Sequence, residues 1–254
     1  MNFFSSEFAH NYGTYSFGYC NYCEYEAGDS LSEMYEKGYL PYSGSEDIWN
    51  TFYMARSSRI EVQQWEPNSE NRRVLRAHED AFTRTVYAKK DFEMNQDFKE
   101  FCLTYFETHH GAHAMPTGRL DHILEEDALT HIVSYENGDT LAGYVFLAAD
   151  KDMTHVWFYF YAPEFAKSSF GMWFLLNEAS VAKKEGKKHF YIGTAYGDKS
   201  RYKTNFSNLE FWDGKKWLQD KNNREVKSRI HNDHLDLIDG TDEFKADKNN
   251  YFDL

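Results

Sequence analysis

The chain has 254 residues, which is enough for one large domain or two small ones with a buried core. Hydrophobic residues make up 41% and charged residues 27%, a composition that excludes a disordered or low-complexity protein. No apolar run approaches the about 18 residues of a membrane span, and residues 1–13 lack the basic and apolar regions of a signal peptide. Three cysteines cannot form a disulfide framework, so we expect a cytoplasmic protein without a membrane segment.

The formal net charge of −13 argues against broad binding to a polyphosphate, but the charges are unevenly distributed. Residues 1–50 carry eight acids and one base, whereas residues 183–203 carry seven bases and two acids. Arg72, Arg73 and Arg76 form a second basic cluster. These patches are consistent with a local site for a phosphate-bearing ligand, or with solvated helix faces. The aromatic content of 18% suits a stacking surface or pocket as well as a core.

Local structure in the first third is weakly patterned. Residues 1–50 are rich in Gly, Tyr and Ser, and they contain one helix candidate, residues 31–38, which stops at Gly38. Residues 58–62 alternate like a strand. Residues 67–71 form a turn with helix-start chemistry, which predicts a helix over 72–82.

The pattern is stronger from residue 94 onward. Apolar residues on one side predict a helix over 94–109, and residues 131–149 predict two strands joined by a turn at Asn137-Gly138-Asp139. The remaining segments are a strand over 155–165 ended by Pro163, a helix from Ser168 to Gly186, a strand over 187–197 and a polar, mostly acidic tail over 221–254. This order is that of the GNAT acyltransferase fold, in which two central strands splay apart, although other α+β folds contain similar runs.

Six short motifs follow one another between residues 20 and 217. They are Cys20-Asn-Tyr-Cys23; Met34-Tyr-Glu-Lys-Gly38-Tyr39 with Tyr53; Arg59-Ile60-Glu61-Val62 with Trp65, Pro67 and Arg72-Arg73-Val-Leu-Arg76; Tyr105 with His110 and Met115; Phe158-Tyr-Phe-Tyr-Ala-Pro163 with Ser169-Phe-Gly171; and Tyr191-Ile-Gly193 with Tyr202-Lys203-Thr-Asn-Phe206, Glu210, Gly214 and Trp217. In this order they resemble the motifs of the aminoacyl-tRNA–protein transferases, which comprise the arginyl enzymes and their bacterial leucyl relatives. The resemblance implies a C-terminal GNAT-like fold. It also implies transfer of arginine or leucine from charged tRNA to the N-terminal amine of a protein, which marks that protein for degradation in the N-degron pathway.

We therefore expect an α+β protein in which a small N-terminal α/β domain precedes a GNAT-like acyltransferase domain with a central mixed sheet. The expected boundaries are residues 1–85 for the first domain, 86–220 for the second and 221–254 for the tail.

The sequence departs from the family at several positions. The family carries further cysteines where this chain has Ala55 to Ser58, and in some arginyl enzymes four such cysteines hold a metal or an iron–sulfur cluster. Cys20 and Cys23 alone cannot make a four-thiolate site, so we interpret them as a remnant and expect no metal and no cofactor. Gly193-Thr194-Ala195 stands where the family has G-Y-W, and Ala162 replaces an Asp, which leaves the donated amino acid and the acceptor residue open.

Aminoacyl transfer needs little activation of the donor, because the tRNA ester is already reactive. The enzyme must align the acceptor amine with the ester carbonyl, keep that amine deprotonated and stabilise an oxyanion. No nucleophilic Ser or Cys is required, which agrees with the absence of a G-x-S-x-G motif. We expect Tyr202, Lys203 and Asp198 to be catalytic; Asp198 and Glu210 either orient an amine or pair with neighbouring lysines.

Charged tRNA is the expected co-substrate. Lys199, Arg201 and Lys203 are the best candidates to bind its acceptor end, with Tyr196 and Tyr202 stacking on the terminal adenosine. The alternative is a basic surface loop whose tyrosines pack inward.

The expected acceptor is a protein with an N-terminal Asp or Glu. Arg72, Arg73 and Arg76 suit its carboxylate or a tRNA phosphate, unless they form an exposed helix face. Arg56 and Arg59 are further candidates for the acceptor pocket. We expect a monomer.

His109, His110 and His113 form an H-H-x-x-H cluster. Such spacing holds a metal only with a further carboxylate and a distant third ligand, neither of which is indicated, so no metal is assigned here.

Three other functions stay open. A CoA-dependent N-acetyltransferase is disfavoured because residues 166–172 hold one Gly and the bulky Phe170 where a pyrophosphate loop is needed. The acceptor is alternatively another peptide or a small amine. A non-catalytic module that binds acidic N-termini is the third.

Overall fold

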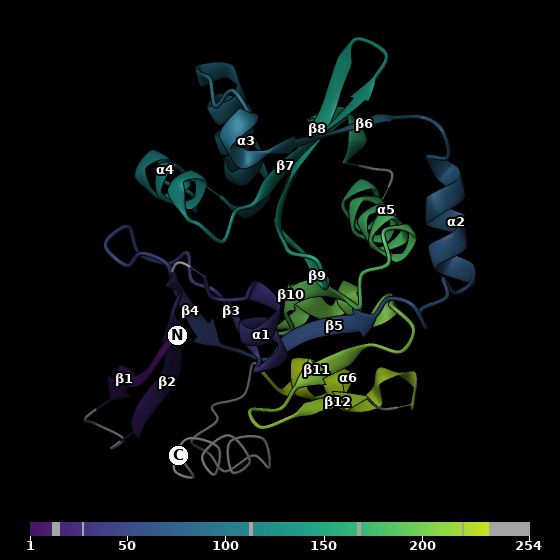
Figure 1. Cartoon of the computed structure of the whole chain (residues 1–254). Coiled ribbons are helices and arrows are strands. Elements are labelled where there is room, and N and C mark those ends of the chain that lie inside the picture. Colours follow the sequence, from purple (N-terminus) through teal and green to yellow (C-terminus); the bar gives the residue numbers. More distant parts are fainter. Residues whose placement is uncertain (12–15, 27, 112–113, 167–168, 220, 234–254) are drawn as a thin grey trace. The chain divides into compact units, whose positions relative to one another are not determined.

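The computed structural model describes residues 1–11, 16–26, 28–111, 114–166, 169–219 and 221–233 (Figure 1). The chain divides into two compact units, each with its own core. The first comprises Met1–Tyr42, Asn50–Glu61 and Tyr191–Leu254, and the second comprises Ser43–Trp49 and Val62–Phe190. These units are defined by compactness alone. The domain boundaries expected from the sequence, at residues 85/86 and 220/221, stay a prediction.

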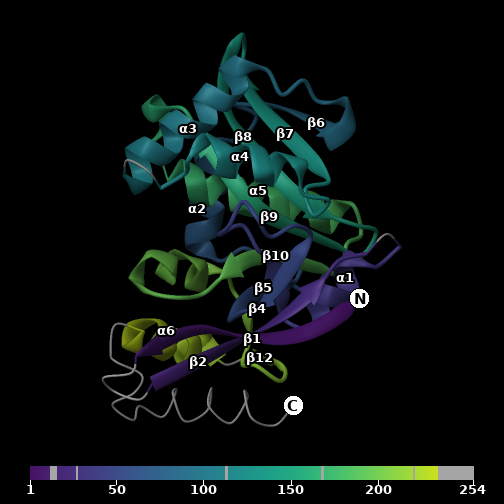
Figure 2. The same ribbon diagram turned by 90° about the vertical axis from the view of Figure 1, so that its left-hand side faces the viewer.

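The first unit contains a four-stranded antiparallel sheet in the order β1-β2-β4-β3. Its strands are β1 (Asn2–Asn11), β2 (Ser16–Glu24), β3 (Tyr39–Pro41) and β4 (Thr51–Met54). Strands β1 and β2, which pair in antiparallel register, are seen from another side in Figure 2. Helix α1 (Leu31–Glu36) precedes β3 and ends at Gly38, whose φ of +82° and close approach to the Trp212 ring leave no room for a side chain.

A second group of strands in the first unit runs in the order β12-β11-β5-β10. They are β5 (Ser57–Glu61), β10 (His189–Thr194), whose first two residues belong to the second unit, β11 (Glu210–Trp212) and β12 (Trp217–Gln219). The 3-10 segment η3 (Asp198–Asn205) follows β10, and the short 3-10 segment η4 (Lys221–Asn223) leads into helix α6 (Arg224–Asn232). Asn223 joins the two segments, because its side-chain Nδ2 donates to the carbonyls of Thr204 and Phe206.

The second unit is built on the antiparallel strands β9-β8-β7-β6. Their bounds are Thr83–Ala88 for β6, His131–Asn137 for β7, Thr140–Ala149 for β8 and Met153–Tyr161 for β9. The helices are α2 (Ser69–Ala77), α3 (Gln96–His110), α4 (Thr117–Glu125) and α5 (Phe170–Lys184), with short 3-10 segments η1 (Lys89–Asp91) and η2 (Pro163–Phe165).

Helices cover both faces of these strands (Figure 1). On one face α3 and α4 enclose a core that includes Ile132, Phe146 and Phe160, one from each of β7, β8 and β9. On the other face Phe174 of α5 packs against the ring of Tyr135. Strands β7 and β8 are thus largely buried on both sides, which explains the nearly continuous apolar run of β8, whereas the edge strand β6 stays partly exposed.

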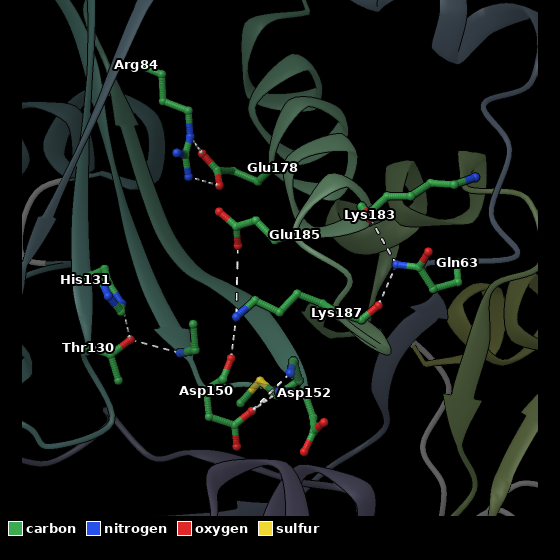
Figure 3. Close-up of polar contacts among 12 residues, drawn as sticks. Gln63, Arg84, Thr130, His131, Asp150, Asp152, Glu178, Lys183, Glu185 and Lys187 are labelled. Carbon is green, nitrogen blue, oxygen red and sulfur yellow. Dashed lines mark hydrogen bonds and ion pairs between the residues drawn. The ribbon is translucent and has the colours of Figure 1, made fainter.

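A buried ion pair fixes α5 to the edge strand β6 (Figure 3). Arg84 donates to both carboxylate oxygens of Glu178, at 2.9 and 2.8 Å, and the Tyr135 hydroxyl donates to the same carboxylate. Asn177 in turn donates to the Tyr135 oxygen. Burial, followed by the nearby Glu178 charge, raises the pKa of Tyr135 well above its usual value. Every partner of this carboxylate is a donor, so the buried charge is compensated.

Most elements predicted from the sequence are confirmed, as is the α+β class. The turn at Asn137–Asp139 joins β7 and β8, and the helices over 31–38, 94–109 and 168–186 appear as α1, α3 and α5. The helix expected over 72–82 begins earlier, at Ser69, and ends at Ala77. Strands β1 to β4, β6, β11 and β12 and helices α4 and α6 are missing from the prediction; α6 lies within the segment interpreted as a tail.

Candidate functional site

Lys203 lies where β10 ends in the first unit. The chain leaves the buried strand at Thr194 and turns into η3, and Lys203 on η3 extends back so that its Nζ donates to the Thr194 carbonyl at 2.5 Å. The residue is only 8% exposed, and no carboxylate among the described residues forms an ion pair with it. Burial therefore lowers the pKa of Lys203 from 10.5 to about 7. An amine that is partly neutral at pH 7 can accept a proton from a substrate.

The neighbours of Lys203 on η3 divide into exposed and buried groups. Asp198, Lys199 and Arg201 are exposed to solvent, and Tyr202 is half-buried with its ring centroid 5.9 Å from the Lys203 Nζ. The structure thus places the predicted catalytic and tRNA-binding residues of η3 on one short segment. The charged side chains at its surface suit contact with a phosphate, whereas Lys203 does not face solvent.

A second basic side chain, Arg56, contacts the chain at Ala195, the residue that directly follows β10. Its Nη1 donates to the Ala195 carbonyl at 3.2 Å, and its guanidinium lies 4.7 Å from the centroid of the Tyr196 ring. The Tyr196 hydroxyl accepts a hydrogen bond from the Arg56 backbone N–H at 2.8 Å, while 48% of Tyr196 stays exposed. The carboxylate of Asp233, at the end of α6, lies 2.9 Å from Nη1. Arg56 is thus held in place by three neighbours.

Arg59 on β5 is also engaged within the first unit. Its Nε donates to Glu210 at 2.7 Å, its Nη1 donates to the Tyr191 hydroxyl at 3.1 Å, and its guanidinium lies 4.0 Å from the Trp217 ring. Glu210 therefore pairs with an arginine of the neighbouring strand β5, across the β11–β5 pairing in which the two residues are partners. These contacts favour a role in joining strands β5 and β11.

The arginines of the other cluster lie on α2 in the second unit. Arg73 forms an exposed ion pair with Glu70, three residues before it. Arg72 donates to the Pro67 carbonyl at 2.5 Å, and the Nε of Arg76 donates to the Arg72 carbonyl at 3.3 Å. The three side chains face solvent on a capped helix, so their predicted role in acceptor or phosphate binding stays a prediction.

Cys20 and Cys23 both lie on strand β2. Residues three apart on a strand point to opposite faces, and accordingly Cys23 is fully buried whereas Cys20 is partly exposed. Their Sγ atoms lie near different backbone carbonyls, those of Met54 and Glu24 respectively. Within the described part of the chain, no group of three His, Cys, Asp or Glu side chains is arranged to hold a metal ion.

The histidines at the end of α3 take part in aromatic packing. His109 stacks on the Tyr105 ring at 4.2 Å, and its Nδ1 is 3.0 Å from the Tyr105 carbonyl. His110 packs against Phe106. His113, the third member of the predicted cluster, lies outside the described residues.

Asp233 and the carbonyls of Thr194 and Ala195 were not predicted as parts of the site. The carbonyls carry no side-chain signal, and Asp233 stands 177 residues from Arg56 in a segment interpreted as a tail. Thr194 and Ala195 did give one hint, since they stand where the family motif is altered.

Comparison with known proteins identifies the family of this chain. The family model described as arginine-tRNA-protein transferase, C terminus, matches residues 79–213, more than half of the chain. An aspartate/glutamate leucyltransferase from Xanthomonas oryzae pv. oryzae is 28% identical over 173 residues, which cover 63% of this chain and 66% of that protein. One from Jannaschia sp. is 28% identical over 163 residues, covering 61% and 56% of the two chains. The matched region thus spans less than two thirds of the length of these relatives.

Among solved structures, L-PGS from Bacillus licheniformis resembles the chain with a TM-score of 0.42 at 9% identity, over 64% of this chain and 49% of the other. The family match is the stronger finding because it covers η3 and the last strand motif as well as β6 to α5. The chain belongs to the arginine-tRNA-protein transferase family, as defined by the C-terminal region of its members. None of the helices in the described residues is both long and apolar enough to cross a membrane.

Proposed function

We propose that this protein transfers an aminoacyl group from charged tRNA to the α-amine of an acceptor protein or peptide. The observation that carries the proposal is Lys203, a buried lysine with a pKa of about 7 at the end of β10, inside the region that matches the family. An acyltransferase of this kind needs a group that removes a proton from an ammonium at neutral pH, and Lys203 has the required pKa.

The reaction is aminolysis of an ester. The acceptor amine, with a pKa near ~8, gives a proton to the neutral Lys203 amine and attacks the ester carbonyl. A C–N bond forms, the tetrahedral intermediate collapses, and the bond to the 3′-oxygen of the tRNA breaks. After attack the nitrogen gives its second proton to the departing 3′-oxygen, so the tRNA leaves as its hydroxyl form. Lys203 releases the first proton to water, so the side chain returns to its starting state.

The names of the relatives supply the finer part of the proposal. They are called aspartate/glutamate leucyltransferases, so we assign leucine as the donated residue ahead of arginine and an acidic N-terminal residue as the acceptor. The product would be an N-degron, and the supply of charged tRNA places the reaction in the cytoplasm. Lys199 and Arg201, exposed on η3, are assigned to the phosphates of the tRNA acceptor end, with the exposed Tyr196 ring as a surface for the terminal base.

The experiment is a transfer assay with matched donors and acceptors. Radiolabelled Leu-tRNA and Arg-tRNA are incubated separately with the protein and with peptides that begin with Asp, Glu or Ala, and acetyl-CoA serves as a rival donor. Label on the acidic peptides from one tRNA supports the proposal. Acetylation without aminoacyl transfer would replace it with an N-acetyltransferase.

The role of Lys203 is tested in the same assay with Lys203→Met and with Lys216→Met, an exposed lysine of the same unit, as the control. Loss of a general base lowers the rate by about 100-fold or more. The rate of the unaltered protein should rise with pH, reach half its maximum near pH 7 and level off about one pH unit higher, as Lys203 loses its proton. An unchanged rate in Lys203→Met would show that Lys203 is structural. The expected monomer in solution is a separate prediction, which light scattering tests.

A further inference from the structure

Asp233 is held in a cradle that would suit the side chain of an acidic substrate. Its two carboxylate oxygens lie 2.9 and 3.0 Å from the Arg56 Nη1, and one of them also accepts the Gly197 backbone N–H at 2.7 Å. Only 5% of the Arg56 side chain is exposed, and its guanidinium lies over the Tyr196 ring. A guanidinium and a backbone N–H that converge on one point recognise any carboxylate, whichever chain it comes from.

This cradle adjoins the group assigned to the chemistry. Arg56 binds the carbonyl of Ala195 and Lys203 binds the carbonyl of Thr194, so the two cations are attached to consecutive peptide units of the chain. The two hydrogen bonds therefore place Arg56 and Lys203 at the same end of β10. In an N-terminal Asp or Glu, only one to two methylene groups separate the carboxylate from the α-carbon that bears the amine.

The residue that fills the cradle comes from a helix secured at its other end. Asn223 fastens the start of α6 through its bonds to Thr204 and Phe206, and Val226 and Ile230 bury the helix face. Asp233 lies just beyond the last helical residue, and 13% of its side chain is exposed to solvent. The carboxylate can thus leave the cradle by a movement of the helix end, while Asn223 keeps the helix attached.

We propose that Arg56 and the Gly197 amide form the binding site for the acidic side chain of an acceptor N-terminus, and that Asp233 occupies this site as an internal substitute until such an acceptor displaces it. The identity of the ligand rests on the proposed function; the carboxylate site itself does not. Occupation by Asp233 makes the site selective, because a neutral side chain cannot supply the negative charge that Arg56 loses when Asp233 leaves.

The test measures peptide binding without tRNA. Peptides that begin with Asp, Glu, Asn or Ala, labelled at the C-terminus, are titrated with the full chain and with Asp233→Asn, and binding is followed by fluorescence anisotropy. If Asp233 fills the site about nine tenths of the time, its removal tightens binding of the acidic peptides by about tenfold. The Asn and Ala peptides should not gain.

The matched control is Glu225→Gln, which breaks the Arg229–Glu225 ion pair on the same helix, 3.0 Å long, without touching the cradle. Arg56→Gln should abolish the preference for Asp over Asn. Equal affinity for all four peptides in Asp233→Asn, or no gain for the acidic ones, would show that Asp233 and Arg56 form a structural ion pair only.

A second measurement uses the unaltered chain, so that it does not depend on the folding of a variant. Saturation with an Asp peptide should speed hydrogen exchange at the C-terminal end of α6, whereas the Ala peptide should not. Unchanged exchange at saturation would overturn the displacement. Tightened peptide binding by Asp233→Asn without any aminoacyl transfer would support this inference and refute the proposed function. Transfer to acidic peptides combined with no effect of Asp233→Asn on binding would support the proposed function and refute this inference.

Discussion

Substitution of Lys203 by Met should make the stability of the protein less dependent on pH. The folded chain lowers the pKa of Lys203 from 10.5 to about 7 because the amine is removed from water and has no paired carboxylate among the described residues. That fall corresponds to about 5 kcal/mol, the cost of keeping the charged amine in the folded state. Met has a similar length, suits the buried position and carries no charge.

The direction with pH follows from proton binding. Below pH 7 the folded and unfolded chains both carry the proton, and the cost is fully present. Between pH 7 and 10.5 only the unfolded chain binds it, so the stability of the unaltered protein rises with pH by about 1.4 kcal/mol per pH unit. Above 10.5 the cost is gone. Lys203→Met lacks this rise, so its advantage in unfolding free energy should be largest at pH 6 and should shrink steadily by pH 9.

Urea unfolding followed by tryptophan fluorescence at pH 6, 7, 8 and 9 measures the effect, with Lys216→Met as the control for loss of an exposed amine. The difference between the unaltered chain and Lys203→Met should fall by about 2 kcal/mol from pH 7 to 9. A difference that stays constant across this range would mean that Lys203 keeps an ordinary pKa, and the argument for it as a general base would fail with it.

Three further outcomes are expected. Arg84→Met should lower the unfolding free energy by about 3–5 kcal/mol, because it leaves the Glu178 carboxylate buried and unpaired. The double variant Arg84→Met with Glu178→Met should recover most of that loss. Losses that add in urea unfolding would contradict this prediction. Arg59→Met should cost about 2–3 kcal/mol through the loss of Glu210 and the Trp217 ring, and if its thermal midpoint were unchanged, the contacts of Arg59 would not be stabilising. A strong metal chelator should leave the thermal midpoint unchanged because the two cysteines of β2 lie on opposite faces of the strand, and a lowered midpoint would point to a bound metal.

Local signals in the sequence predicted the elements that local chemistry determines. Asn95 accepts from the Phe98 N–H as an N-cap, and Asn68 with Asn71 closes a capping box, so α3 and α2 begin where short polar side chains offer these bonds. Gly138 takes the positive φ that the β7–β8 turn requires. In β1 and β2, by contrast, the residues alternate too weakly to show a strand, and pairing with each other and with β4 determines them instead.

Only part of the site follows from sequence. The motif around Lys203 marked the segment, but neither the burial of that lysine nor its low pKa is visible in a run of basic residues. Helix α6 has two apolar residues, Val226 and Ile230, one turn apart, which is too few to separate it from a polar tail. Asp233, at the end of this helix, pairs with Arg56, which lies 177 positions earlier, and such a contact depends on the tertiary fold alone.

Charge balance links the two basic groups at the end of β10. Arg56 carries a permanent charge that Asp233 offsets, whereas burial leaves Lys203, which has no ion-pair partner among the described residues, about half neutral near pH 7. In the proposed exchange an acidic side chain takes the place of Asp233, so Arg56 would stay compensated and Lys203 would keep the low pKa that its burial causes. An N-terminal Ala cannot do this, because it would leave a buried guanidinium without a counter-charge or leave Asp233 in the way. In this proposal, selection of the acceptor and removal of its proton both depend on the end of β10, where Arg56 and Lys203 bind consecutive carbonyls and one carboxylate, from Asp233 or from the substrate, pairs with Arg56.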